Sequence, residues 1–408
     1  MAYSYREVLK EPRALRVFGA ALLGRLSFAM GPLSLVLFVR AATGSFAVAG
    51  AASAATALTS GLFAPVRGRM VDRYGQARTL PPLSLLYAAA FVGVLLLASA
   101  GRAGEAAAVL LSGVAGAAAP PLAASMRVLW SALVGGGPRL QTAFALDTVV
   151  EGVLFTLGPL LASGLAAAFA PAAALAAVAA LAVVGTLAFI SSPVSKGWIP
   201  TVGEGRAGWA GAMSGRGIRT LVISLTGFGA AVGIIDITLV AAARQAGSAS
   251  LGGVLLALLS AGGVVGGLWY GRRAWRLEAG SRYLRMLALL ALVSAALPLA
   301  RPLPLLGLVV VAVGLLLSPV QSCAYVLAAE LAPAGTMTEA ATWVITAINV
   351  TAAAGIALAG VLVGGPGVAW TLVVSWGCMA AAFLAALVGR GALLPSGSVA
   401  PQGTTEAP

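Results

Sequence analysis

Hydrophobic residues occur along this chain in about twelve long runs, separated by short segments that hold most of the charged residues. The runs lie near 14–39, 45–66, 80–100, 105–126, 140–165, 171–191, 220–243, 250–271, 283–300, 303–328, 341–364 and 367–389. Most have the roughly 20 residues that an α-helix needs to cross about 30 Å of hydrocarbon. The pattern therefore predicts an all-α integral membrane protein with about twelve transmembrane helices.

The runs fall into two groups of six, separated by a polar stretch that contains prolines and glycines. We expect an N-terminal six-helix bundle over 1–190, a cytoplasmic linker over 191–217, a C-terminal six-helix bundle over 218–390 and a disordered cytoplasmic tail over 391–408. Several arginines and glycines recur 203 positions apart, as Gly68 and Gly271 do. This favours a pseudo-symmetric repeat of two halves.

The composition excludes a water-soluble protein, since 60% of the residues are hydrophobic and only 9% are charged. The chain has no histidine, and both cysteines, Cys323 and Cys378, lie inside apolar runs. We therefore expect no metal site, no catalytic residues and no cofactor. A membrane-embedded enzyme would need a nucleophile–base pair or a metal-ligand set inside the runs, and the sequence shows neither.

The positive charge is distributed in a way that defines topology. Placing the N-terminus inside puts 20 of the 25 basic residues on the cytoplasmic side. Only Arg40, Arg102, Arg244 and Arg301 then lie outside. This bias predicts a multi-pass protein of the cell membrane with both termini in the cytoplasm. We expect a lipid bilayer and a small-molecule substrate as its partners, no nucleic acid, and a monomer.

One short connector carries a specific motif. Between the second and third runs the chain reads Gly68-Arg69-Met70-Val71-Asp72-Arg73-Tyr74-Gly75-Gln76-Ala77-Arg78. An ordinary basic loop would explain its arginines but not its Gly/Asp/Gly spacing. The spacing resembles the signature loop between helices 2 and 3 of major facilitator superfamily transporters. That resemblance implies two six-helix halves rocking around a central cavity, and a gating loop formed by Gly68, Asp72, Arg73, Gly75 and Arg78.

Four charged residues fall clearly inside the apolar runs: Arg25, Asp147, Glu151 and Asp236. Arg25 and Glu151 each lie about eleven residues, or roughly 16 Å, from the cytoplasmic start of their helices, so we expect them to pair. Asp147 shares the helix face of Glu151, and Asp236 lies too far along its helix to join them. Three carboxylates would then face one guanidinium. Burial would favour the protonated form of an unpaired acid, as proton coupling requires; the alternative is a purely structural ion pair.

Two further features are candidates. Gly152 and the pair Gly158-Pro159 in helix 5 partly resemble the Gly-Pro motif of drug:proton antiporters in the same superfamily. Helix 4 contains Pro120-Pro121, and we expect no arginine within the membrane there. In the superfamily, helices 1, 4, 7 and 10 line the cavity, which makes Gln321, Ser322 and Tyr325 of helix 10 weak candidates for substrate contact.

The run from Thr336 to Glu339 has the features of a helix N-cap with an acid in the first turn. In the superfamily the acid of the loop between helices 2 and 3 docks at this point. Here Glu339 would repel Asp72 unless an arginine lies between them.

From these features we expect export of a small hydrophobic or amphipathic molecule by alternating access with proton antiport. The alternative is uptake by proton symport. A non-transporting sensor would need a sizeable soluble output domain, which the sequence does not show.

Overall fold

The chain folds entirely into helices. A computed structural model describes residues 5–10, 12–98, 100–198, 211–247, 250–273, 275–300 and 302–394. Within these residues, 12 helical segments are long and apolar enough to cross a membrane, which confirms the predicted fold class. They are α2 (Pro12–Thr43), α3 (Phe46–Tyr74), α4 (Gln76–Leu97), α5 (Gly101–Ala118) with α6 (Leu122–Val134), α7 (Pro138–Ala168), α8 (Pro171–Ser191), α10 (Arg216–Gln245), α11 (Ser250–Arg272), α12 (Ala279–Ser294) with η2 (Leu297–Leu299), α13 (Leu303–Leu331), α14 (Met337–Gly364) and α15 (Val368–Val388).

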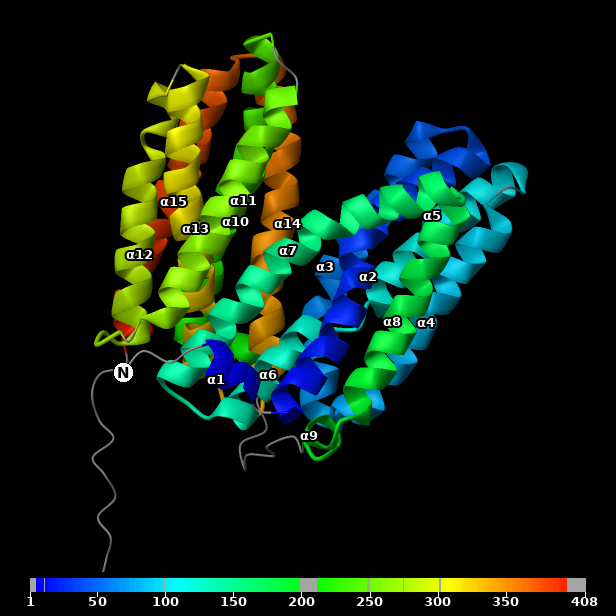
Figure 1. Cartoon of the computed structure of the whole chain (residues 1–408), viewed down its shortest axis with the longest axis horizontal. Coiled ribbons are helices and arrows are strands. Elements are labelled where there is room, and N and C mark those ends of the chain that lie inside the picture. Colours follow the sequence, from blue (N-terminus) through cyan, green and yellow to red (C-terminus); the bar gives the residue numbers. More distant parts are fainter. Residues whose placement is uncertain are drawn as a thin grey trace, which may run out of the picture.

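The long helices form two bundles that diverge at one end of the molecule and meet at the other (Figure 1). In the N-terminal bundle α2 packs against α7 and α8, and α3 packs against α5. In the C-terminal bundle α10 packs against α14 and α15, and α11 packs against α13. The most extensive contacts between the bundles are those of α3 with α14 and of α7 with α11, and α13 also packs against α7.

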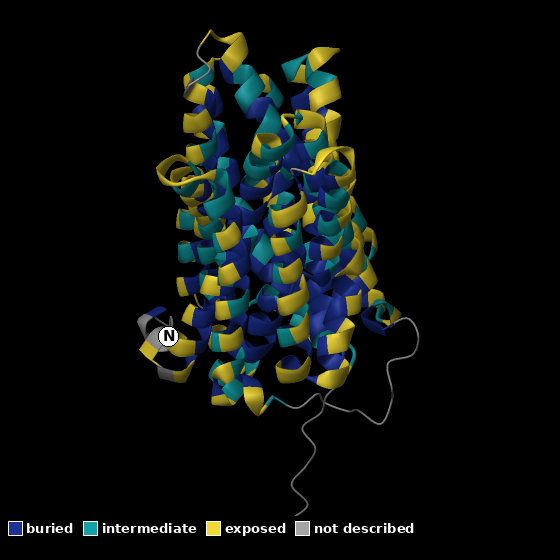
Figure 2. Cartoon of the chain, turned by 90° about the vertical axis from the view of Figure 1, so that its right-hand side faces the viewer, coloured by how far each residue is buried: buried dark blue, intermediate teal, exposed yellow. Residues whose placement is uncertain are grey.

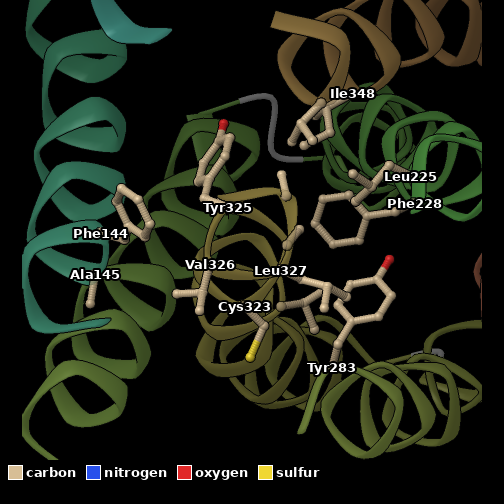
Figure 3. Close-up of a cluster of buried hydrophobic side chains, with 14 of the residues drawn as sticks. Phe144, Ala145, Leu225, Phe228, Tyr283, Cys323, Tyr325, Val326, Leu327 and Ile348 are labelled. Atoms are coloured by element: carbon tan, nitrogen blue, oxygen red, sulfur yellow. The ribbon is translucent and has the colours of Figure 1, made fainter. Parts of the chain in front are cut away.

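Burial follows the arrangement expected in lipid. Large apolar side chains such as Leu62, Leu96 and Leu110 are exposed on the outside of the helices, and most buried residues face the interior (Figure 2). One continuous apolar core includes residues of both bundles, among them Phe144 of α7 and Tyr325 and Leu327 of α13 (Figure 3). The two bundles are therefore packed together at their closed end and not merely linked by the chain.

The fourth membrane-crossing segment departs from the prediction of one continuous helix. Helix α5 ends at Ala118 and α6 begins at Leu122. Pro120 and Pro121 interrupt the segment because proline supplies no backbone N–H. The freed carbonyl oxygens of Gly116 and Ala117 accept hydrogen bonds from Arg67 of α3. Arg67, which the topology argument counted among cytoplasmic residues, is buried at this break.

Short helices lie between and beyond the bundles. The predicted linker contains α9 (Pro193–Lys196) and the single turn η1 (Gly211–Ser214), and residues 199–210 lie outside the described residues. The tail predicted to be disordered from 391 begins instead inside α16 (Arg390–Leu393), where Leu393 is fully buried. Residues 395–408 lie outside the described part of the chain.

Candidate functional site

A cluster of four charged side chains lies where α2, α6 and α7 meet. Arg25 Nη1 lies 2.6 Å from Asp147 Oδ1, and Arg127 Nη2 lies 2.9 Å from Asp147 Oδ2. Glu151 Oε2 accepts a hydrogen bond from Arg127 and lies 3.6 Å from Arg25 Nη2. Asp147 and Glu151 reach the same two guanidiniums because four residues separate them on one helix. The formal charges of the cluster therefore balance.

Arg127 corrects three sequence-based expectations. The sequence places Arg127 in a cytoplasmic segment and predicts that helix 4 has no arginine within the membrane. It also predicts that three carboxylates face a single guanidinium. Instead Arg127 is 2% exposed and pairs with both acids of α7. The predicted contact of Arg25 with Glu151 exists, but Asp147 is the closer partner. The sequence did contain one indication that Arg127 is buried, because its neighbours from Met126 to Trp130 are apolar.

The members of the cluster differ in their access to solvent. Asp147 is fully buried, whereas Glu151 is 17% exposed. Burying a charge is costly unless it is paired, and Asp147 has a guanidinium close to each of its oxygens. Glu151 is the carboxylate of the cluster that solvent can reach.

The cluster is connected to the C-terminal bundle by α13. The ring of Tyr325 lies 3.6 Å from the guanidinium carbon of Arg127, a cation–π contact. Ser322 Oγ donates a hydrogen bond to Thr148 Oγ1 of α7 at 3.2 Å, and Gln321 Nε2 donates one to the Tyr325 hydroxyl at 3.1 Å. The candidate substrate residues Ser322 and Tyr325 are thus buried against the other bundle in this conformation.

Asp236 of α10 stands apart from this cluster. It is half-buried, and it forms no ion pair or hydrogen bond with any residue that the structure describes. Its carboxylate therefore lacks the compensation that Asp147 and Glu151 receive.

The glycines of helix 5 have different surroundings. A Cβ at Gly158 of α7 would lie 2.6 Å from the carbonyl carbon of Ala29 in α2, so only glycine allows this close helix approach. Pro159 follows it within the helix. A Cβ at Gly152 would meet open space, so this glycine has no steric role in this conformation.

Asp72 docks on the first turn of α14. Its carboxylate accepts hydrogen bonds from the backbone N–H groups of Thr338 at 3.0 Å and Glu339 at 2.8 Å. The N-cap residue Thr336 supplies no side-chain cap, so Asp72 caps this helix from the other bundle. Arg69 lies beside Asp72 and donates to both carboxylate oxygens of Glu339, as the charge argument required.

The rest of the gating loop is held by backbone geometry and by one residue that sequence reasoning missed. Gly75 adopts a φ of +85°, which favours glycine, at the bend between α3 and α4. Gln76 is buried, donates to the carbonyl oxygen of Ser125 at 3.1 Å and accepts from Ser195 at 2.8 Å. Arg73 and Arg78 are exposed. The motif treats position 76 as variable, so its spacing could not identify Gln76.

A second contact closes the same end of the molecule. Gln141 Nε2 of α7 donates to the carbonyl oxygens of Tyr270 and Arg273, each at 3.0 Å, and Gln141 Oε1 accepts from Arg282 Nη1 at 2.8 Å. Tyr5, in the short helix α1 (Tyr5–Lys10), donates to the carbonyl oxygens of Gly267 and Leu268 in α11. Burial raises the pKa of this phenol to about 12. Tyr5 is therefore a neutral donor at physiological pH.

Residues 17–356 match the sequence profile of the Major Facilitator Superfamily. The chain belongs to this superfamily. No curated protein matches the sequence. Among solved structures, a bacterial homologue of the iron transporter ferroportin in its outward-facing state superposes with a TM-score of 0.72, at 14% identity, over 92% of this chain and 99% of that one.

Two other transporters of known structure share the fold. The human organic anion transporter MFSD10 (TETRAN) has a TM-score of 0.67 at 18% identity, covering 95% of this chain and 99% of its own. The major facilitator superfamily transporter FucP in its outward conformation has a TM-score of 0.70 at 13% identity, covering 93% and 98%. At these identities the similarity shows the shared fold alone.

Proposed function

We propose that this member of the superfamily is a secondary active transporter of the cell membrane that exports a small hydrophobic or amphipathic molecule in exchange for protons. The supporting observation is the charge cluster of α2, α6 and α7, in which the partly exposed Glu151 shares two guanidiniums with a fully buried aspartate. No cofactor is needed, because the proton gradient supplies the energy. The protein acts as a monomer.

Protonation of Glu151 is the step by which the cluster would couple proton binding to a change in the packing of the two bundles. It would leave Arg25 and Arg127 with Asp147 as their remaining anionic partner in the cluster. Arg127 also contacts Tyr325 in the other bundle, so a change in its charge environment acts on the packing between the halves. Asp236, which lacks a cationic partner among the described residues, is a second candidate proton carrier.

The proposed topology sets the direction that the structure faces. If both termini are cytoplasmic, the end closed by Asp72, Gln141 and Tyr5 faces the cytoplasm, and the end at which the bundles diverge faces outward. Export is favoured by the close approach of α7 at Gly158, which belongs to the Gly-Pro pattern of helix 5, and by the mostly apolar composition of the helices of both bundles.

The second candidate is uptake of a small anionic solute by proton symport. It is favoured by the two buried guanidiniums, since protonation of Glu151 would leave excess positive charge next to the interface of the bundles. MFSD10, which shares the fold, is an organic anion transporter.

Flux into proteoliposomes tests the proposal and separates these alternatives. An antiporter should accumulate ethidium when the lumen is acidic, whereas a symporter should accumulate benzenesulfonate, an anion that stays ionised and does not cross lipid as a neutral acid, when the outside is acidic. Glu151→Gln should abolish gradient-driven accumulation but retain counterflow, because exchange needs no net proton movement. Thr156→Val on the exposed face of α7 is the matched control. Gradient-driven flux by Glu151→Gln at the wild-type rate would refute coupling through this cluster.

A further inference from the structure

A basic pocket outside the charge cluster of α2, α6 and α7 lies where α11 connects to α12. It has a volume of about 440 Å³ and is lined by Arg273, Trp275, Arg276, Leu277, Arg282, Arg285 and Met286. No carboxylate lines it, although Glu278 occurs in the same connector. Positive inside topology explains arginines on this side of the membrane, but it does not require four of them to share one cavity.

The charges in this pocket are incompletely compensated. Arg282 is 5% exposed, and its Nε has no hydrogen-bond partner among the described residues, although Nη1 is bonded to Gln141. The other three guanidiniums, of Arg273, Arg276 and Arg285, belong to exposed residues. Glu330 interacts electrostatically with Arg282, but no carboxylate lines the cavity itself, so four like charges around it favour the binding of an anion between them. Guanidinium groups bind phosphate oxygens well because their N–H donors are paired and planar.

The position of the pocket identifies the source of the phosphate. It lies between the last turn of one membrane-crossing helix and the first turn of the next, at the level of the membrane surface. The guanidinium of Arg273 lies 5.5 Å and 5.0 Å from the ring centroids of Trp269 and Trp275, and tryptophan is enriched at this depth. Leu277 and Met286 add apolar lining. Basic pockets of this kind at the cytoplasmic ends of membrane helices suit anionic lipid headgroups.

We propose that this pocket binds the phosphate of an anionic phospholipid headgroup. Its walls also take part in the contact between the bundles, because Gln141 of α7 bonds to Arg282 and to the carbonyl oxygen of Arg273. A bound headgroup holds these residues in place and stabilises the conformation in which this end is closed.

The full chain, purified in an uncharged detergent, tests the site by titration with phosphatidylglycerol or phosphatidylcholine in mixed micelles. The readouts are the lipid retained in native mass spectrometry and the thermal midpoint. Wild type should bind phosphatidylglycerol in preference to phosphatidylcholine. The double variant Arg276→Gln with Arg285→Gln should bind it about 25-fold more weakly, at about fivefold per arginine. The lysine pair at the same positions should restore much of this affinity.

The control variant is Arg216→Gln with Arg219→Gln, which removes two exposed arginines of α10 that do not line the pocket. This control should bind phosphatidylglycerol as wild type does. An equal loss of affinity in the control would show that the lipid is attracted by basic surface in general and not by this pocket. Inorganic phosphate at millimolar concentration should not reproduce the thermal shift. If it does, a soluble anion is the ligand and the lipid assignment is wrong.

Discussion

Asp147 and Glu151 are one helical turn apart, yet their surroundings assign them different roles. Asp147 is completely buried and has a guanidinium within ion-pair distance of each of its oxygens, whereas Glu151 is partly exposed and more distant from Arg25. The first carboxylate therefore holds α2, α6 and α7 together, and the second is the one to which our proposal assigns proton coupling.

This difference predicts unequal effects of two isosteric substitutions. Asp147→Asn leaves two buried guanidiniums with one anionic partner, and loss of one partner from a buried pair costs about 3–5 kcal/mol. Its thermal midpoint in detergent should fall far more than that of Glu151→Gln. Combining Asp147→Asn with Arg25→Met should recover part of the loss because formal charge again balances. Equal destabilisation by the two single variants would contradict the assigned roles.

Helical spacing predicted that Arg25 pairs with Glu151, on the same face as Asp147, and this contact exists, but Asp147 is the closer partner of Arg25. The spacing could not rank those acids, because both lie on one face and the choice depends on side-chain reach. Arg127 was missed for another physical reason. Apolar runs show which parts of the chain can enter lipid. They do not show that the helix resumes after Pro120-Pro121 as α6 and so buries Arg127 between the helices.

At the scale of elements, the closed end of the molecule is held by the end of α3, which caps the start of α14. Asp72 at the end of α3 replaces the missing side-chain cap of α14, and a Cβ at Gly68 would lie 2.9 Å from the Cα of Glu339. The resemblance to the superfamily motif implied this contact, and two of the residues that the motif fixes, Gly68 and Asp72, do meet α14.

Asp72→Asn should therefore loosen the closed end without unfolding the protein. The amide loses the charge that favours a helix N-terminus, and its NH₂ group cannot accept from a backbone N–H. A cap of this kind is worth about 1 kcal/mol, which shifts the opening equilibrium about fivefold. A cysteine at the buried position Ala341 of α14 should react faster with a water-soluble maleimide in this variant. Arg73→Gln, which removes an exposed charge from the same loop, should leave the rate unchanged; an equal increase there would show that the cap is not responsible.

At the scale of the whole molecule, the two bundles meet at the end that carries α1 and the Gly68–Arg78 loop (Figure 1). Length and hydropathy were sufficient to predict the two groups of six helices. They could not predict which end is closed, because closure depends on side-chain contacts between residues that are remote in sequence.

Cysteine labelling in intact cells checks the orientation. In a background that carries Cys378→Ser, cysteines at the exposed positions Phe46 and Ala246 should react with an impermeant reagent, and cysteines at Arg78 and Arg219 should react only after permeabilisation. The reason is the excess of arginines on the second side. Reaction at Arg78 from outside would invert the topology, and the closed end would then face out of the cell.

The contact of Tyr5 with α11 has a consequence for biosynthesis. Its acceptors lie 262 and 263 residues further along the chain. At about 5–20 residues per second, a ribosome needs on the order of 10–50 s after making Tyr5 to produce them. Helix α1 is thus made long before α11 and can dock only once the second bundle has begun to assemble on the first. A docked α1 shows that α11 has reached its place, and a nascent or truncated chain lacking α11 must expose this segment to proteases and chaperones.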